Sequence, residues 1–298
     1  MHKLVPFLFI LFLLFSCAKM TEEKRAQLAR ENYSQGISAY GRKDYREAIS
    51  RLTESLKYLE NLSPEEIKSA KYTLGESYYL RKDYINAIVY LEDFLFYYPD
   101  SPEAERVYFM VVDSYMKVAP DAHRDQGYTF RAIDKAKEFL SKYPNSPYGD
   151  RVVELIEGAQ TKLARHEYLI GRFYEDFGYY YSASLRYKNL IVNYSGQISE
   201  AEVLYRYIKS LLLVREQAKR QEAKYSKWIK SAKEELKKAK SEDDKKAIQK
   251  RIEFFQKEID RWRSLAEESY REGLKDMETY REVYGENLYY KELRKYAR

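Results

Sequence analysis

Apolar and small residues recur along most of this chain at the three- and four-residue spacings that place them on one face of an α-helix. Residues 41–49 and 80–88 both contain the string Arg-Lys-Asp-Tyr, so the same local pattern returns after 39 residues. Gly36 and Gly75 keep that offset. With only 11 Gly and 7 Pro in 298 residues, few helix breakers interrupt the pattern. The periodicity therefore predicts an all-α chain built from repeated helix pairs.

Small and large residues alternate in these repeats in a way that suits crossing helices. Small residues let two antiparallel helices approach closely, and large residues one turn away fill the space beside the crossing. The clearest copy follows the tetratricopeptide pattern of Leu-Gly-x-x-Tyr, then Ala-x-x-x-Phe, then Pro, with Leu74, Gly75, Tyr78, Ala87, Leu91 and Pro99. Because one pair cannot bury its own apolar face, neighbouring pairs stack. We predict a tetratricopeptide-like superhelix of five pairs, which begin near residues 26, 66, 103, 149 and 199.

A charged segment interrupts the fifth repeat. Residues 215–263 hold 17 Lys/Arg and 10 Asp/Glu, and their apolar positions alternate at spacings of four and three. Ser241 followed by three acidic residues suits the start of a second helix, because Ser caps the helix and the acids complement its dipole. We predict an antiparallel coiled-coil hairpin over residues 219–264, inserted in the last repeat. Its basic surface fits either a solvated face or contact with a membrane surface or anionic lipid.

The N-terminus has the pattern of an export signal. The apolar run Leu4–Phe15 is too short to span a bilayer and has the length of a signal-peptide core. It ends in Leu-Phe-Ser-Cys, which resembles a bacterial lipobox, although a cleaved signal with an incidental Cys is the alternative. We predict a signal peptide over residues 1–16, acylation of Cys17, and a linker over 17–25. Ala18 resembles the sorting residue of proteobacterial lipoproteins that go to the outer membrane, so we expect a lipid anchor on its periplasmic side.

Composition argues against catalysis and metal binding. The chain has three His, at 2, 123 and 166, and its one Cys is Cys17. A zinc site needs about four clustered ligands, and a catalytic triad needs a well-placed His. No Gly-rich phosphate loop is present. We therefore expect no enzymatic activity, no cofactor and no metal, and the export signal disfavours nucleic acid. A cell-wall enzyme would need a separate globular domain, and no remaining segment is long enough to form one.

The lipobox, the repeats and several turn strings together resemble the BamD family, the outer-membrane lipoproteins of the β-barrel assembly machinery. The strings that carry the resemblance occupy residues 98–102, 124–126, 143–148 and 163–168. The resemblance covers residues 17–218 and resumes near 266, while the long hairpin departs from the shorter members. It implies a non-enzymatic scaffold that binds the barrel protein BamA and unfolded outer-membrane protein clients, with other assembly lipoproteins as further expected partners. The alternative is another tetratricopeptide-repeat lipoprotein, such as a secretin pilotin.

The resemblance also implies site residues. Arg186 matches an Ala-x-x-Arg position in the fourth repeat that is implicated in the BamA contact, within C-terminal repeats at 149–218 and 265–298. Clients are implied to bind the N-terminal repeats, 26–148. In tetratricopeptide superhelices the first helix of each pair lines the concave face, where a peptide can dock, although some of these Tyr side chains can instead pack between pairs. The residues counted onto that face are Tyr33, Ile37, Tyr40, Tyr72, Glu76, Tyr79, Phe109 and Asp113.

Overall fold

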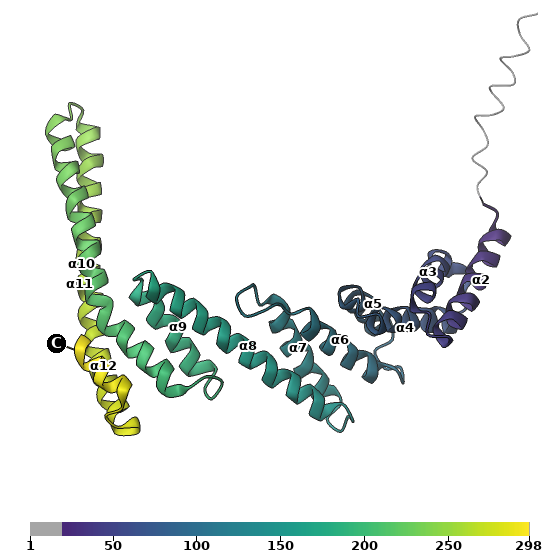
Figure 1. Ribbon diagram of the computed structural model, residues 1–298. Helices are drawn as coiled ribbons and strands as arrows, with labels where there is room; N and C mark the ends of the chain where they lie inside the picture. Colours follow the sequence, from purple (N-terminus) through teal and green to yellow (C-terminus); the bar gives the residue numbers. More distant parts are fainter. Residues whose placement is uncertain (1–19, 298) are drawn as a thin grey trace, which may run out of the picture. The chain divides into compact units, whose positions relative to one another are not determined.

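The computed structural model describes residues 20–297, and within that range it contains α-helices, one 3₁₀ segment and no strand (Figure 1). The predicted all-α helical-repeat fold is confirmed. The signal peptide and Cys17 lie outside the described residues. The helices form five consecutive pairs and a final helix: α2 (Glu22–Gly41) and α3 (Tyr45–Ser55), followed by η1 (Leu56–Asn61); α4 (Pro64–Leu80) and α5 (Tyr84–Tyr97); α6 (Ala104–Val118) and α7 (Gly127–Lys142); α8 (Gly149–Asp176) and α9 (Tyr180–Asn193); α10 (Glu200–Lys238) and α11 (Glu242–Tyr284); and α12 (Leu288–Tyr296).

The repeated Arg-Lys-Asp-Tyr string forms the turn between the helices of the first two pairs. Its Lys adopts a left-handed conformation, with φ of 63° at Lys43 and again at Lys82. In the first pair the following residue is Asp44, whose backbone N–H donates a hydrogen bond to the carbonyl of Ala39 at 2.9 Å. The Asp44 side chain then accepts from the backbone N–H of Glu47, which caps the next helix. The string therefore repeats because it ends one helix and starts the next.

The small residues of the repeat lie where paired helices touch. A methyl group added at Gly75 would lie 2.6 Å from Leu91, and one at Gly171 would lie 2.7 Å from Tyr187. Leu91 and Tyr187 are fully buried. Close backbone approach at these two positions therefore requires glycine, as the spacing predicted.

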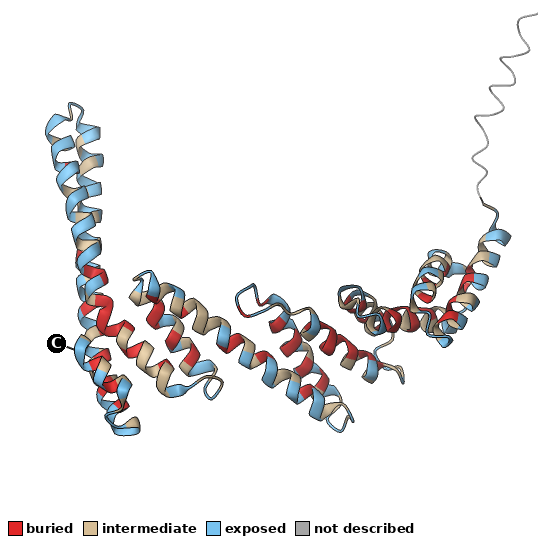
Figure 2. Cartoon of the chain, viewed as in Figure 1, coloured by how far each residue is buried: buried red, intermediate tan, exposed pale blue. Residues whose placement is uncertain are grey.

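The chain divides into two compact units. The first holds the described residues up to Ala119 together with Gly127–Ile156, and the second holds Pro120–Gln126 and the described residues from Glu157 onward. Buried side chains form one core between α5 and α6 in the first unit and one around α9, α10, α11 and α12 in the second (Figure 2). No helix in the described part of the chain is both long and apolar enough to cross a membrane. The predicted division into repeats at 26–148, 149–218 and 265–298 stays a prediction.

Helices α10 and α11 extend beyond the core as a long hairpin with its turn at Ala239–Ser241. The Ser241 hydroxyl accepts from the backbone N–H groups of Asp243 and Asp244, so the expected cap is present. Along the hairpin, Ala232 and Ile259 are buried between the two helices. Ion pairs from Arg263 to Glu222 and from Arg251 to Glu235 join the helices. Most other surface of the distal hairpin is exposed (Figure 2).

Candidate partner-binding surfaces

The first helices of the first three pairs are joined by polar contacts along the predicted client face. The Tyr40 hydroxyl of α2 donates to Glu76 Oε2 of α4 at 2.8 Å, and Arg106 of α6 pairs with the other oxygen of the same carboxylate. Glu76 is only 1% exposed. Burial and the hydrogen bond to Glu76 raise the pKa of the Tyr40 hydroxyl, which keeps it a neutral donor. Glu76 is therefore an internal link between three helices.

A second link has the same form. The Tyr79 hydroxyl of α4 donates to Asp113 Oδ2 of α6 at 3.0 Å, and Asp113 is also buried. Burial, followed by the nearby charge of Asp113, raises the pKa of Tyr79. A docking peptide could use Glu76 or Asp113 only by displacing these hydroxyl donors. Both acids lie on the first helices of their pairs, and the structure gives each of them an internal partner.

The remaining residues of the predicted client face are apolar contacts that stay partly exposed. Tyr33 and Ile37 pack on the core formed by Leu52, Ala70 and Leu74. Tyr72 packs at 5.8 Å from the ring of Phe94, and the ring of Phe109 stacks at 4.6 Å on Tyr148. The structure therefore brings the eight predicted residues onto neighbouring helices α2, α4 and α6, and leaves ring edges and one aliphatic side chain for contact.

Arg186, the predicted partner-contact residue, lies on α9 in the second unit. Its guanidinium donates from Nη1 to both oxygens of Glu167 on α8, at 3.2 and 3.4 Å. The Arg186 side chain remains 41% exposed, whereas Glu167 is 14% exposed. Glu167 therefore fixes the direction of an arginine that still presents donors to solvent. Since arginine carries five N–H donors, donors remain for a partner.

A buried ionic cluster, which sequence analysis missed, lies behind this surface. Glu175 on α8 accepts from Arg206 at 3.0 Å and from Lys209 at 2.9 Å on α10, and from the Tyr187 hydroxyl of α9 at 2.8 Å. Burial alone would raise the pKa of Glu175, but these donors and cations outweigh it and hold the pKa below its usual value. The cluster ties α8, α9 and α10 together. No sequence motif marks it, because its members come from three helices.

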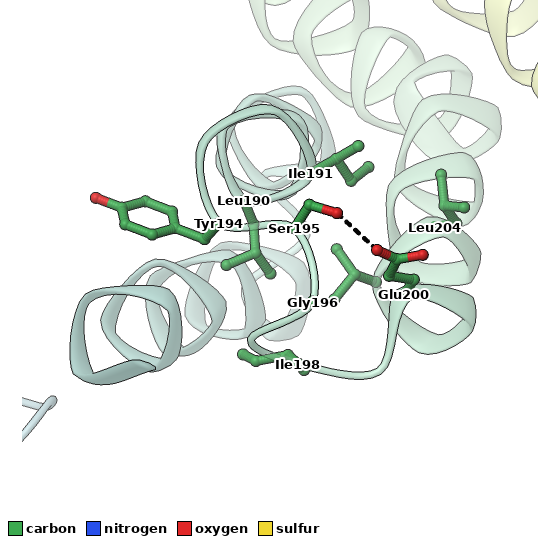
Figure 3. Close-up of a pocket in the computed structure, with 9 residues that line it drawn as sticks. Leu190, Ile191, Tyr194, Ser195, Gly196, Ile198, Glu200 and Leu204 are labelled. Carbon is green, nitrogen blue, oxygen red and sulfur yellow. Dashed lines mark hydrogen bonds between the residues drawn. The ribbon is translucent and has the colours of Figure 1, made fainter. Parts of the chain in front are cut away.

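The turn after α9 contains an apolar pocket of about 140 Å³ (Figure 3). Its walls come from Leu190 and Ile191 of α9 and from Val203 and Leu204 of α10, and the Ser195 hydroxyl donates to Glu200 at 2.6 Å beside it. Ligand pockets usually exceed about 300 Å³, so this one can admit a single apolar side chain rather than a cofactor. Sequence analysis assigned no role to these residues.

The loop of the third repeat is held by backbone acceptors. Gln126, which is buried, donates from Nε2 to the carbonyls of Asp121 and Arg124 at 2.9 and 2.8 Å. His166 Nδ1 lies 2.7 Å from the carbonyl of Ala122, so this histidine joins α8 to the loop instead of standing free on a helix surface. Among residues 20–297 no group of three or more His, Cys, Asp or Glu could hold a metal ion.

Comparison with known proteins gives one family match and one close relative. The family described as "YfiO: Outer membrane lipoprotein" matches residues 25–227. A protein of Aquifex aeolicus (strain VF5), named "Putative outer membrane protein assembly factor BamD", is 49% identical over 285 residues, which cover 96% of this chain and 93% of that protein. A solved Rap protein bound to competence and sporulation factor is 15% identical, with 98% of this chain and 79% of that chain covered. Its TM-score of 0.32 is too low to support an argument.

Proposed function

This chain belongs to the YfiO or BamD family of outer-membrane lipoproteins, and on that premise we propose that it is a non-enzymatic scaffold for the assembly of outer-membrane β-barrel proteins. The observation that carries the proposal is the 49% identity to an assembly factor along nearly the whole length of both chains. The protein is lipid-anchored to the outer membrane on its periplasmic side. Its contribution to assembly is to hold partners in place, so its side chains make and break no bond.

The second unit supplies the contact with a BamA-like barrel protein that carries periplasmic domains. Arg186 supports this assignment because Glu167 orients it while 41% of its side chain stays exposed. Phe173, Phe177 and Leu185 are also at least half exposed on α8 and α9 or the turn between them. The second unit thus presents an oriented arginine and exposed apolar side chains, which are residue types that interface centres favour.

A pull-down from detergent-solubilised envelope tests this contact, with mass spectrometry of the captured proteins. We expect a barrel protein with tandem periplasmic domains to be captured, and Arg186→Ala to reduce its yield at least about tenfold, as loss of an interface arginine commonly does. Arg151→Ala is the control, because Arg151 is similarly exposed but lies in the first unit beside Glu154. Capture of a secretin ring instead, or equal yields from both variants, would contradict the proposal.

The first unit receives unfolded clients on the face formed by α2, α4 and α6. The partly exposed Tyr33, Ile37 and Tyr72 offer ring and aliphatic surface to an apolar segment, while the links through Glu76 and Asp113 keep the three helices in register. A photo-crosslinker at position 37 should capture unfolded outer-membrane proteins. The same group at Ser50, which is exposed on the second helix of the pair, should not. Equal crosslinking at the two positions would argue against a client face.

A further inference from the structure

One face of the distal part of α10 is strongly basic. The six lysines at its centre are Lys219, Lys227, Lys230, Lys233, Lys237 and Lys238, which we call the lysine stripe, and all are exposed. With 3.6 residues per turn, they fall on one solvent-facing side of α10, beside rather than directly opposite the buried Ala218 and Ala232. Residues 219–240 carry nine Lys/Arg and three Asp/Glu, whereas residues 242–264 carry seven and six. The excess of positive charge is therefore confined to one helix of the hairpin.

Solubility alone does not account for the lysine stripe. The surface of α11 is equally solvated but mixes both signs, which is the usual pattern of an exposed helix. Lys227, Lys230 and Lys233 follow one another at three-residue spacing, and like charges at that spacing destabilise a helix. Within the described part of the chain, Lys237 pairs with Glu234, and no ion pair joins an acid to the other five lysines. Their charge is thus left available to a partner of opposite sign.

The exposed aromatic side chains of the hairpin lie on another side from the lysine stripe, close to the seam between α10 and α11. Trp228 of α10 is 41% exposed and Phe254 of α11 is 55% exposed, in a cluster where Trp228 lies 5.4 Å from the ring of Phe255. The Lys224 ammonium sits 4.6 Å from the centre of the Trp228 ring. Trp228 therefore shares a surface with Lys224, and the lysine stripe itself is purely basic.

We propose that the lysine stripe docks on an anionic phospholipid surface. Charge complementarity selects this occupant, and a protein of the outer-membrane lipoprotein family always has a bilayer within reach. Lysine is a compact, flexible point charge, which suits attraction to a field of lipid phosphates. The hairpin thereby gives the protein a second, reversible membrane contact in addition to its acyl anchor.

Vesicle flotation tests this site. The chain from residue 17 carrying Cys17→Ser, which cannot be acylated, is mixed with phosphatidylcholine vesicles that contain or lack phosphatidylglycerol. We expect binding only with phosphatidylglycerol, and its loss as salt is raised. The combined change of Lys227, Lys230 and Lys233 to Gln should lower the partition coefficient at least about tenfold, since each lysine near an anionic surface contributes to binding. Trp228→Ala, which alters another side of α10 and leaves the charge unchanged, should bind nearly as well as the parent chain.

The matched control changes Lys245, Lys246 and Lys250 of α11 to Gln, which removes the same charge from the other helix. This control should bind nearly as well as the parent chain, and circular dichroism verifies that all variants keep their helix content. Equal binding to vesicles with and without phosphatidylglycerol would overturn the proposal. So would an equal loss of binding in the two triple variants, because that result reflects net charge rather than this face.

Discussion

At the scale of single residues, Gly75 and Gly171 fix how closely paired helices approach, because an added methyl would meet Leu91 or Tyr187. Glu175 fixes which charges are buried between α8, α9 and α10. Its partners, Arg206, Lys209 and Tyr187, come from other helices, and no local pattern announces which charge will be buried against which. Sequence patterns therefore locate residues that have a repeated steric role. They miss residues whose role depends on a single tertiary contact between helices.

Gly75→Ala should destabilise the first unit. The added methyl would lie 2.6 Å from Leu91 Cδ2 and 3.3 Å from the Leu91 backbone nitrogen. Overpacking of this kind costs about 1–3 kcal/mol, from which the better helix propensity of Ala recovers about 0.5–1 kcal/mol. Gly158→Ala is the control, because Gly158 lies within α8 with no atom near the added methyl, and this variant should gain stability. Urea denaturation measures both, and an unchanged midpoint for Gly75→Ala would refute close crossing.

Glu175 should make stability depend on acid pH. Because the folded-state pKa of Glu175 is lowered from 4.5, the charged cluster stabilises the fold above that pH and this contribution disappears as pH falls through the lowered value. Glu175→Gln leaves Lys209 without its carboxylate and Arg206 with Glu202 alone, and it should cost about 3 kcal/mol near neutral pH, with a flatter acid dependence. Glu267→Gln removes an exposed partner of Arg215 and should cost less than about 1 kcal/mol. Urea denaturation at several acid pH values measures the free energy of unfolding of both variants. Equal losses of stability in the two would contradict the buried cluster.

At the scale of elements, several helices begin at side-chain caps that are visible in the sequence. Ser63 illustrates this, since its hydroxyl accepts from the Glu66 backbone N–H and the Glu66 carboxylate accepts from the Ser63 backbone N–H at 2.8 Å. The hairpin was also foreseeable, because its apolar positions keep one seam over many turns. The knobs-into-holes packing expected of a coiled coil stays a prediction. The pocket beside Ser195 was not foreseeable, because it depends on how a turn fits against α10.

Ser63→Ala should loosen the start of α4. The change removes the capping hydroxyl and should lower the free energy of unfolding by about 1 kcal/mol. Ser199→Ala is a suitable control, since Ser199 occupies the same position before α10 but its side chain makes no capping hydrogen bond. The thermal unfolding midpoint of Ser63→Ala should therefore fall below that of Ser199→Ala. If both lowered the midpoint equally, the capping box would not be the source of the stability.

At the scale of the whole molecule, fold and family were predictable because both are encoded redundantly, in repeats and in ordered turn strings along the chain. The surfaces were only partly predictable. Counting along repeats placed Tyr40, Glu76 and Asp113 on adjacent helices. It could not show that their polar atoms are already hydrogen-bonded to one another's helices and are therefore not free for a client. The proposed function therefore depends on a stacked-helix scaffold that holds other proteins at the outer membrane.

Conditional depletion of the protein in its own host, followed by measurement of folded β-barrel proteins in the outer membrane, tests this role most directly. The account predicts that folded barrel proteins decline together while their unfolded forms accumulate in the periplasm, and that the parent gene restores them. Unchanged levels of folded barrel proteins after complete depletion would contradict it.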